Sequence, residues 1–222
     1  MNGQIDLSSI IIFKDLNSST LDKVLELPIG KVNYNPGDLV VSEGELLEDL
    51  LVIKSGLLKQ AKLLEDGGEK VVAYYYENEV YPLHLFYADI NKWPYDIYAE
   101  WESEIYLIPW KKLRPIIDND VDLLNNIIKF TAHCTCHTKM ILNATRYKKI
   151  QERIAYWLVN MKYIDSFKIP ATQKMLSDTI RVTRPSLNQE LKKLESLGVI
   201  DIDINEIRVI DEEYLKNILE DV

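Results

Sequence analysis

The 222-residue sequence has few cysteines, no long apolar run and no arginine before Arg114. Two cysteines, Cys134 and Cys136, cannot make a disulfide framework, so a disulfide-stapled secreted domain is excluded. No run approaches the roughly 18–20 apolar residues of a membrane span, and the N-terminus lacks the pattern of a signal peptide. The 47 % hydrophobic and 27 % charged residues are typical of a soluble globular protein. We expect a cytoplasmic protein with no membrane partner.

The formal net charge of −9 is unevenly distributed along the chain. Residues 1–138 carry 12 basic and 22 acidic side chains, whereas residues 139–222 carry 14 and 13. The acidic excess therefore lies entirely in the N-terminal part, which would repel nucleic acid. Any contact with DNA falls to the near-neutral C-terminal part, provided that its basic residues cluster on one face.

Residues 172–195 have the pattern of two short helices joined by a tight turn. Thr172 and Thr183 are suited to cap them, and Pro185 falls in the first turn of the second, where its missing N–H costs little. Three leucines spaced at i, i+4 and i+7 predict a buried face on the second helix: Leu187, Leu191 and Leu194. The pair is a candidate DNA-binding helix-turn-helix, and the alternative is an ordinary helical hairpin in a core.

The polar residues of this pair can reach phosphates and base edges in a major groove. Among them, Gln189 would prefer adenine. Arg181 lies in the turn between the two helices, where it could contact a phosphate. The predicted DNA-binding residues are Thr172, Arg181, Thr183, Arg184, Ser186, Asn188, Gln189, Lys192 and Lys193.

Short β-branched runs at 199–202 and 207–210 follow the helices and predict a hairpin in the place of a wing. The N-terminal half, from about Lys31 to Trp110, alternates short apolar runs with turn signals, which is typical of a barrel or roll. Its last strand is expected to run from Ile97 to Pro109. The turn signals are NPGD at 35–38, EGE at 43–45, SG at 55–56 and DGGE at 66–69.

The sequences YNPGD at 34–38, EGE at 43–45 and LVIKSG at 51–56 resemble the start of a cyclic-nucleotide-binding β-roll. Together with the helix-turn-helix, the chain resembles the CRP/FNR family of bacterial transcription regulators. The resemblance implies an α+β fold with an N-terminal β-roll (a cupin-like jelly roll), a long central dimerisation helix and a C-terminal winged helix-turn-helix. The expected domains are 1–120, 121–147 and 148–222. The implied function is a homodimeric regulator that binds double-stranded DNA under effector control, with RNA polymerase as a further candidate partner.

The resemblance also matches Arg184 to a base-contacting arginine, which makes it the candidate for reading guanine. Arg181 matches a position where many members have glycine, so we expect a positive φ there, which costs roughly 1 kcal/mol for another residue.

Residues 121–147 contain no glycine or proline, and apolar residues recur there at helical spacing. Such a helix between two domains is expected to form a dimer seam, and the alternative is a core helix within one monomer. The expected seam residues are Leu124, Ile127, Thr131, Thr135, Thr138 and Ile141, with Leu142 as an alternative to Ile141.

The family's nucleotide-sensing members hold the cyclic phosphate with a Gly-Glu pair and an Arg-Ser pair. Here Tyr81-Pro82 and Trp93-Pro94-Tyr95 occupy the matching places, so we expect no cyclic nucleotide. An apolar or aromatic effector is one interpretation of the many aromatic residues, and packing of the roll with no ligand is the other. The pocket candidates are Tyr76, Tyr81, Phe86, Trp93, Tyr95, His137 and Thr138.

Two histidines and two cysteines fall within residues 133–137. His133 and His137 are one helical turn apart, but Cys134 and Cys136 lie about 200° apart, so one straight helix cannot bring all four to one metal. We expect no metal and no cofactor, with redox or metal sensing at this run as an alternative. The sequence has no P-loop, Ser-His-Asp arrangement or HExxH motif, so an enzyme is not expected; an enzyme's regulatory subunit is a weaker alternative.

Overall fold

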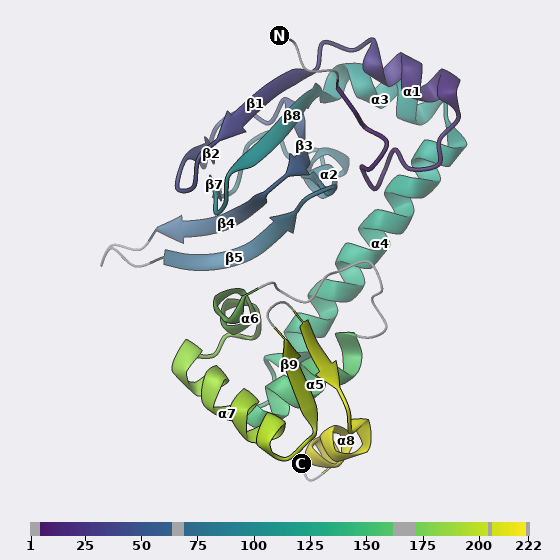
Figure 1. The fold of residues 1–222 in the computed structure, drawn as a ribbon. Coiled ribbons are helices and arrows are strands. Elements are labelled where there is room, and N and C mark those ends of the chain that lie inside the picture. Colours follow the sequence, from purple (N-terminus) through teal and green to yellow (C-terminus); the bar gives the residue numbers. More distant parts are fainter. Residues whose placement is uncertain (1–4, 64–68, 162–171, 204–205, 221–222) are drawn as a thin grey trace. The chain divides into compact units, whose positions relative to one another are not determined.

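The computed structural model of the protein describes residues 5–63, 69–161, 172–203 and 206–220. The chain divides into two compact units, Met1–Ala132 and His133–Val222. Strands dominate the first unit and helices the second (Figure 1), which confirms the predicted α+β class. Helix α4 runs from Val121 to Ala144, and it ends before the predicted Tyr147. No helix in these described ranges is long and apolar enough to cross a lipid bilayer.

The first unit is a roll of two four-stranded antiparallel sheets, with strand orders β1-β8-β3-β6 and β2-β7-β4-β5. Its strands are β1 (Gly30–Tyr34), β2 (Leu39–Val41), β3 (Asp49–Ser55), β4 (Leu57–Leu63), β5 (Glu69–Tyr76), β6 (Val80–Tyr81), β7 (Asp96–Ala99) and β8 (Ser103–Pro109). Its helices are α1 (Ser18–Leu25), α2 (Leu83–Tyr87) and α3 (Trp110–Asp118). This arrangement confirms the β-roll predicted from the short strands. Within the predicted turn at 66–69, residues 66–68 lie outside the described ranges.

The roll packs around β3, whose apolar run from Leu50 to Ile53 is buried on both faces of its sheet. The sharp turn from β3 to β4 depends on Gly56, which has a φ of +95°. A Cβ at this position would lie 2.2 Å from the Ser103 hydroxyl oxygen, so no side chain fits. That hydroxyl in turn accepts a hydrogen bond from the Leu57 N–H at 3.2 Å.

The single strand predicted from Ile97 to Pro109 is wrong, because the chain changes sheets within it. Strand β7 ends at Ala99 and pairs with β2 and β4, whereas β8 begins at Ser103 and pairs with β1 and β3. The backbone N–H groups of Glu100 and Trp101 both donate to the Leu57 carbonyl, which fixes the turn. No glycine or proline marks this corner, and the alternation of residue types continues from Ala99 to Ile105, so the sequence pattern does not reveal it.

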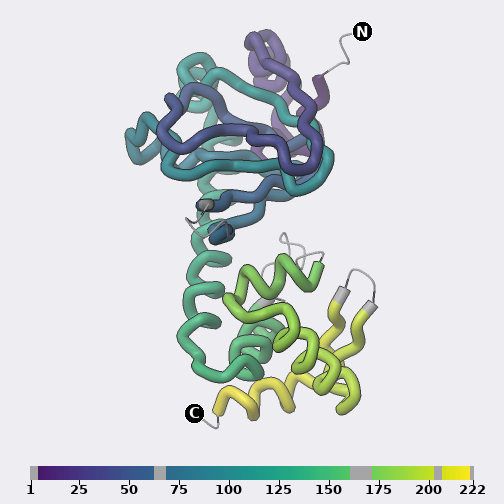
Figure 2. The backbone as a smooth tube through the Cα atoms, turned by 90° about the vertical axis from the view of Figure 1, so that its left-hand side faces the viewer, coloured from purple at the N-terminus to yellow at the C-terminus, as the bar shows by residue number. Residues whose placement is uncertain are grey.

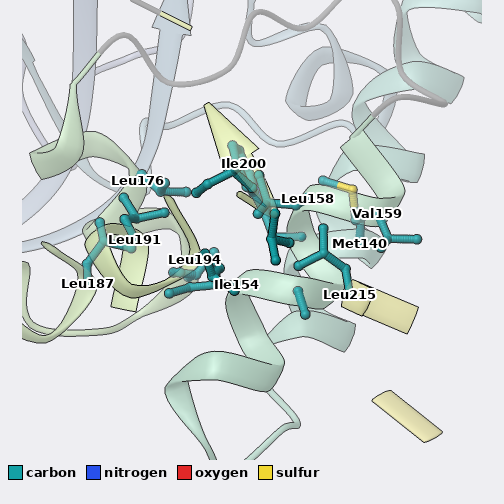
Figure 3. Close-up of a cluster of buried hydrophobic side chains, with 14 residues drawn as sticks. Met140, Ile154, Leu158, Val159, Leu176, Leu187, Leu191, Leu194, Ile200 and Leu215 are labelled. Atoms are coloured by element: carbon teal, nitrogen blue, oxygen red, sulfur yellow. The ribbon is translucent and has the colours of Figure 1, made fainter. Parts of the chain in front are cut away.

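The second unit folds around one cluster of buried apolar side chains contributed by all its major elements. These elements, besides the end of α4, are α5 (Ile150–Met161), α6 (Gln173–Ile180), α7 (Arg184–Ser196), β9 (Ile200–Asp203), β10 (Glu206–Val209) and α8 (Glu212–Glu220). Figure 3 shows the core residues converging from the different helices and from β9. Trp157 is the largest side chain in this core and is fully buried. The core positions α6 and α7, which form the candidate site.

Candidate functional site

Both helices of the predicted pair begin at the threonines that the sequence indicates. The Thr172 hydroxyl oxygen accepts a hydrogen bond from the Met175 N–H at 3.2 Å, and the Thr183 oxygen accepts one from the Ser186 N–H at 3.4 Å. The Thr183 hydroxyl also donates to the Ser186 hydroxyl at 2.8 Å. These contacts satisfy N–H groups that a helix start leaves unpaired. They confirm the predicted caps, and they give three of the candidate DNA-contacting residues a structural role.

The turn between α6 and α7 contains Arg181 in the left-handed region, with φ 56° and ψ 54°. Its backbone N–H donates to the carbonyls of Ser177 and Asp178, which closes α6. This confirms the positive φ predicted for the turn. The guanidinium of Arg153, on α5, donates to the Arg181 carbonyl at 2.9 Å and to the Ile180 carbonyl at 3.4 Å. Helix α5 therefore stabilises the turn between α6 and α7 through these two hydrogen bonds.

Helix α7 has one buried and one exposed face, and Figure 2 shows how it follows α6 through the turn. The leucines at 187, 191 and 194 are fully buried, as predicted. On the other side, Arg184, Gln189, Lys192 and Lys193 are exposed, while Asn188 is half-buried. The Lys193 ammonium lies 3.9 Å from the Glu190 carboxylate. An exposed polar face on a short helix fits the dimensions of a DNA major groove.

The predicted wing is present as the antiparallel pair β9–β10, in which Ile202 lies opposite Ile207 and Asp201 opposite Arg208. Residues 204–205, at the turn of this hairpin, lie outside the described ranges. Ile202 and Ile207 pack against the core of the unit. A helix-turn-helix followed by a packed hairpin is the order of elements of a winged DNA-binding domain.

Two of the expected seam residues on α4, Ile127 and Ile141, are less exposed than the residues that follow them. Ile127 is only 3 % exposed, because with Leu123 and Phe130 it forms the face of α4 that packs within its own chain. Ile128 is 57 % exposed and Leu142 is 59 % exposed, whereas Ile141 is half-buried. An accessible stripe with alternating spacings of four and three residues therefore contains Leu124, Ile128, Thr131, Thr135, Thr138 and Leu142. This spacing is that of a two-helix seam.

Aromatic rings fill part of the roll interior around Tyr81. Its ring centroid lies 4.2 Å from that of Tyr75, 5.4 Å from His84 and 5.6 Å from Trp93. The Tyr75 hydroxyl donates to the buried side-chain carbonyl of Gln60. Burial lowers the pKa of His84, which favours its neutral imidazole. We call Tyr81, its three ring neighbours Tyr75, His84 and Trp93, and the hydrogen-bonded Gln60 the aromatic cluster. It contains no lysine or arginine.

Other pocket candidates lie outside this cluster. Tyr76 follows Tyr75 on β5, so strand alternation turns it to the opposite face of the sheet. Its N–H donates to the Glu79 carboxylate at 2.9 Å, and burial raises the pKa of Glu79 to about 7. Phe86 stacks instead on Trp110, with centroids 4.4 Å apart.

The remaining candidates are distributed differently. Tyr95 is half-buried two residues beyond Trp93. His137 and Thr138 belong to the part of α4 in the second unit, and the Thr138 hydroxyl donates to the Cys134 carbonyl of its own helix at 2.9 Å. Of the expected set, Tyr81 and Trp93 are in direct ring contact.

The buried side chain of Lys59 points away from the aromatic cluster, and its charge is neutralised by two carboxylates. Lys59 precedes Gln60 on β4, so its side chain lies on the opposite face of the sheet. Its ammonium is 2.7 Å from the Glu69 carboxylate and 3.1 Å from that of Glu100. An anionic ligand in the roll interior would therefore gain no charge compensation from this lysine.

The run at 133–137 lies on α4. Cys136 is exposed and Cys134 is half-buried on α4. Throughout the described ranges, no three or more His, Cys, Asp or Glu side chains are grouped so as to hold a metal ion.

Sequence reasoning missed four residues, of which Gln60, Tyr75 and His84 belong to the aromatic cluster and Arg153 supports the helix-turn-helix. Alternation along β4 places Gln60 on the same face as Leu58, but only the pairing of Leu58 with Tyr75 shows which residues of β5 share that face. No sequence signal identifies Arg153, because its partners are backbone carbonyls distant along the chain.

Comparisons with known proteins agree with this architecture. A family model for the cyclic nucleotide-binding domain matches residues 31–120, and one for the Crp-like helix-turn-helix domain matches residues 152–218. The chain is 19 % identical to Electron transport regulator A of Shewanella oneidensis, over 90 % of this chain and 82 % of that protein.

Among solved structures, a CooA mutant from Carboxydothermus hydrogenoformans aligns with a TM-score of 0.71 at 15 % identity, covering 98 % of this chain and 97 % of that one. FixK2 from Bradyrhizobium japonicum aligns with a TM-score of 0.65 at 18 % identity, covering 86 % and 97 %. These likenesses support the fold, and the two family models together span most of the chain. The protein belongs to the CRP/FNR family of transcription regulators.

Proposed function

We propose that the protein acts as a homodimer that binds palindromic double-stranded DNA. A small effector other than a cyclic nucleotide controls its affinity for the DNA. The observation that supports this most directly is the two-faced α7, with leucines buried beneath and Arg184, Gln189 and Lys192 exposed. Two-fold symmetry would present two such helices to successive major grooves, about 34 Å apart.

Selection of binding sites from random duplex DNA tests this function. We expect two inverted half-sites with centres about 10 base pairs apart, since dimers of this geometry contact one face of the duplex. Guanine opposite Arg184 and adenine opposite Gln189 are the expected preferences within each half-site. Enrichment of no sequence, or of single half-sites only, would contradict the proposal.

The proposed dimer uses the accessible stripe of α4. Its members alternate by four and three residues, and Ile128 and Leu142 expose large apolar side chains to solvent. Exposed apolar residues at this spacing are stabilised when a second helix covers them. Domain limits of 1–120, 121–147 and 148–222 belong to the same proposal.

For the effector, we propose an apolar or aromatic molecule that acts on the roll around the aromatic cluster. The cluster offers ring faces and one amide–hydroxyl pair but no lysine or arginine, which favours an uncharged ligand. A second candidate is a regulator without an effector, because the rings already pack against one another at 4.2–5.6 Å. A regulator that activates transcription would also contact RNA polymerase. In this proposal the protein is cytoplasmic and is not an enzyme.

Calorimetric titration with cyclic AMP and with cyclic GMP should give no heat of binding at millimolar ligand. A buried phosphate needs donors or positive charge, since an uncompensated ion in a low-dielectric site costs several kcal/mol. Pro82 lacks an N–H, and Lys59 is already paired with two carboxylates. The same ligand solutions titrated into a cyclic AMP-binding family member provide the positive control. Micromolar affinity for either nucleotide would contradict this prediction.

A further inference from the structure

The connection between α4 and α5 carries a group of cations that the helix-turn-helix does not include. Arg146, Lys148 and Lys149 fall within four residues, just before the 152–218 range of the matched DNA-binding domain. All three side chains are exposed. The ammonium of Lys149 lies 3.1 Å from the nearly buried carboxylate of Glu152, so that pair is largely neutral. Within the described ranges, Arg146 and Lys148 form no ion pair, which leaves their charges available.

A single side chain connects this segment with the turn of the helix-turn-helix. The Arg153 guanidinium donates from Nε to the Tyr147 carbonyl at 2.7 Å and from one terminal nitrogen to the Arg181 carbonyl at 2.9 Å. Both carbonyls therefore lie against one planar group, and the planar fork of arginine fixes their relative position. Arg146 and Lys148, which flank Tyr147, are thereby held beside the exposed Arg181.

Four exposed basic side chains come together around this turn, namely Arg146, Lys148, Arg181 and Arg184. The first turns of α6 and α7 contain no acidic residue, and Arg181 and Arg184 are both exposed. Duplex DNA presents a phosphate about every 3.4 Å of axis on each strand, so elements beside a helix in the groove come close to flanking phosphates. Basic side chains without a protein partner at such a place can neutralise these phosphates, and the counterions that the DNA then releases favour binding.

We propose that the α4–α5 connection is a second phosphate-contacting element of the DNA interface, in which Arg146 and Lys148 bind backbone phosphates beside the recognition helix. Arg153 is the positioning residue, since it holds the connection in register with the turn and does not itself need to reach DNA. Phosphate contacts carry no sequence information, so this element adds affinity and salt dependence but leaves base preference unchanged. The inference rests on the DNA-binding role of α7 proposed above.

The test compares the full-length R146Q/K148Q variant with a K111Q/K112Q control, measuring affinity for the selected operator by fluorescence anisotropy over a range of salt concentrations. Lys111 and Lys112 are exposed on α3 in the first unit, so the control loses the same charge far along the chain. The plot of log K against log salt should become shallower by about 0.9 for each lost phosphate contact, which is about 3.6 for a dimer that loses two per protomer. The control should keep the wild-type slope.

The proposal would be overturned if the salt slope of R146Q/K148Q differed from that of the wild type by less than about 0.5, since one lost phosphate contact should change it by about 0.9. An equal change in the K111Q/K112Q control would also overturn it. Wild-type protein that binds no selected duplex would instead overturn the proposed function itself. Altered base preference in R146Q/K148Q would also count against the element, because phosphate contacts do not read sequence.

The role of Arg153 is tested by a double-mutant cycle on the same slope. Adding R153Q to R146Q/K148Q should change the slope no further, since the contacts that Arg153 positions are already absent. R153Q alone should make the slope shallower, because the cations that Arg153 positions are no longer held in place. R153K should be as shallow as R153Q, because an ammonium lacks the planar fork that contacts both carbonyls. Additive slopes, or full rescue by lysine, would remove Arg153 from this role.

Discussion

Replacing Arg184 by alanine should weaken binding to the selected operator by about 1–3 kcal/mol in each half-site and should relax one base position there. The physical reason is the loss of the two parallel hydrogen bonds that a guanidinium makes to the edge of guanine. Arg184 is exposed in the first turn of α7, next to the cap formed by Thr183, so its removal leaves the core untouched. Competition binding with operators altered at each position measures both effects.

The matched control is Lys192→Ala, on the same face of the same helix. Lysine that contacts a phosphate supports all sequences alike, so this variant should lose affinity without a change in base preference. Thermal melting of both variants should match that of the wild type, because both side chains are exposed. Equal loss across all operators for Arg184→Ala would show that Arg184 contacts only the DNA backbone.

The second large effect is expected at the dimer seam. Ile128→Glu should raise the dissociation constant of the dimer by at least about 100-fold, since an uncompensated buried charge costs about 3–5 kcal/mol. The side chain is 57 % exposed in the single chain, so the carboxylate would be buried only when two helices meet. Analytical ultracentrifugation over a range of protein concentrations measures this change.

Two neighbouring positions on α4 provide the controls. Lys129→Glu introduces the same carboxylate one residue further along, at an exposed position outside the stripe, and it should leave the dimer intact. Ile127→Glu should instead lower the melting temperature of the first unit, because Ile127 is buried within its own chain. An unchanged dimer in Ile128→Glu would place the interface elsewhere.

The contrast between Ile127 and Ile128 illustrates what the sequence could reveal and what it could not. Helical periodicity correctly predicted a long helix with an apolar stripe, since periodicity is a local property. Ile127 and Ile128 belong to two stripes about 100° apart around α4, and both stripes fit the sequence pattern. Only the packing of the first unit shows that its core covers the stripe of Ile127. The caps at Thr172 and Thr183 were predictable because their partners lie three residues away.

Errors in the roll have the same origin. The corner at Glu100–Glu102 separates two strands of different sheets without a glycine or proline to mark it, so the sequence predicted one strand. Tyr75 and Tyr76 are chemically identical neighbours, and only the pairing of Tyr75 with Leu58 shows which one faces inward. Long-range contacts thus decided each point that composition and spacing left open, including the hydrogen bonds of Arg153.

The two buried cores have an optical consequence. Trp157 is the only tryptophan after residue 132 and is fully buried, while the first unit contains the other three, among them Trp93 at 4 % exposure. Indole fluorescence shifts to longer wavelength when the ring meets water. A chain in which phenylalanine replaces the three earlier tryptophans would therefore report the unfolding of the DNA-binding unit alone, and comparison with the intact chain would show whether both units unfold in one cooperative transition.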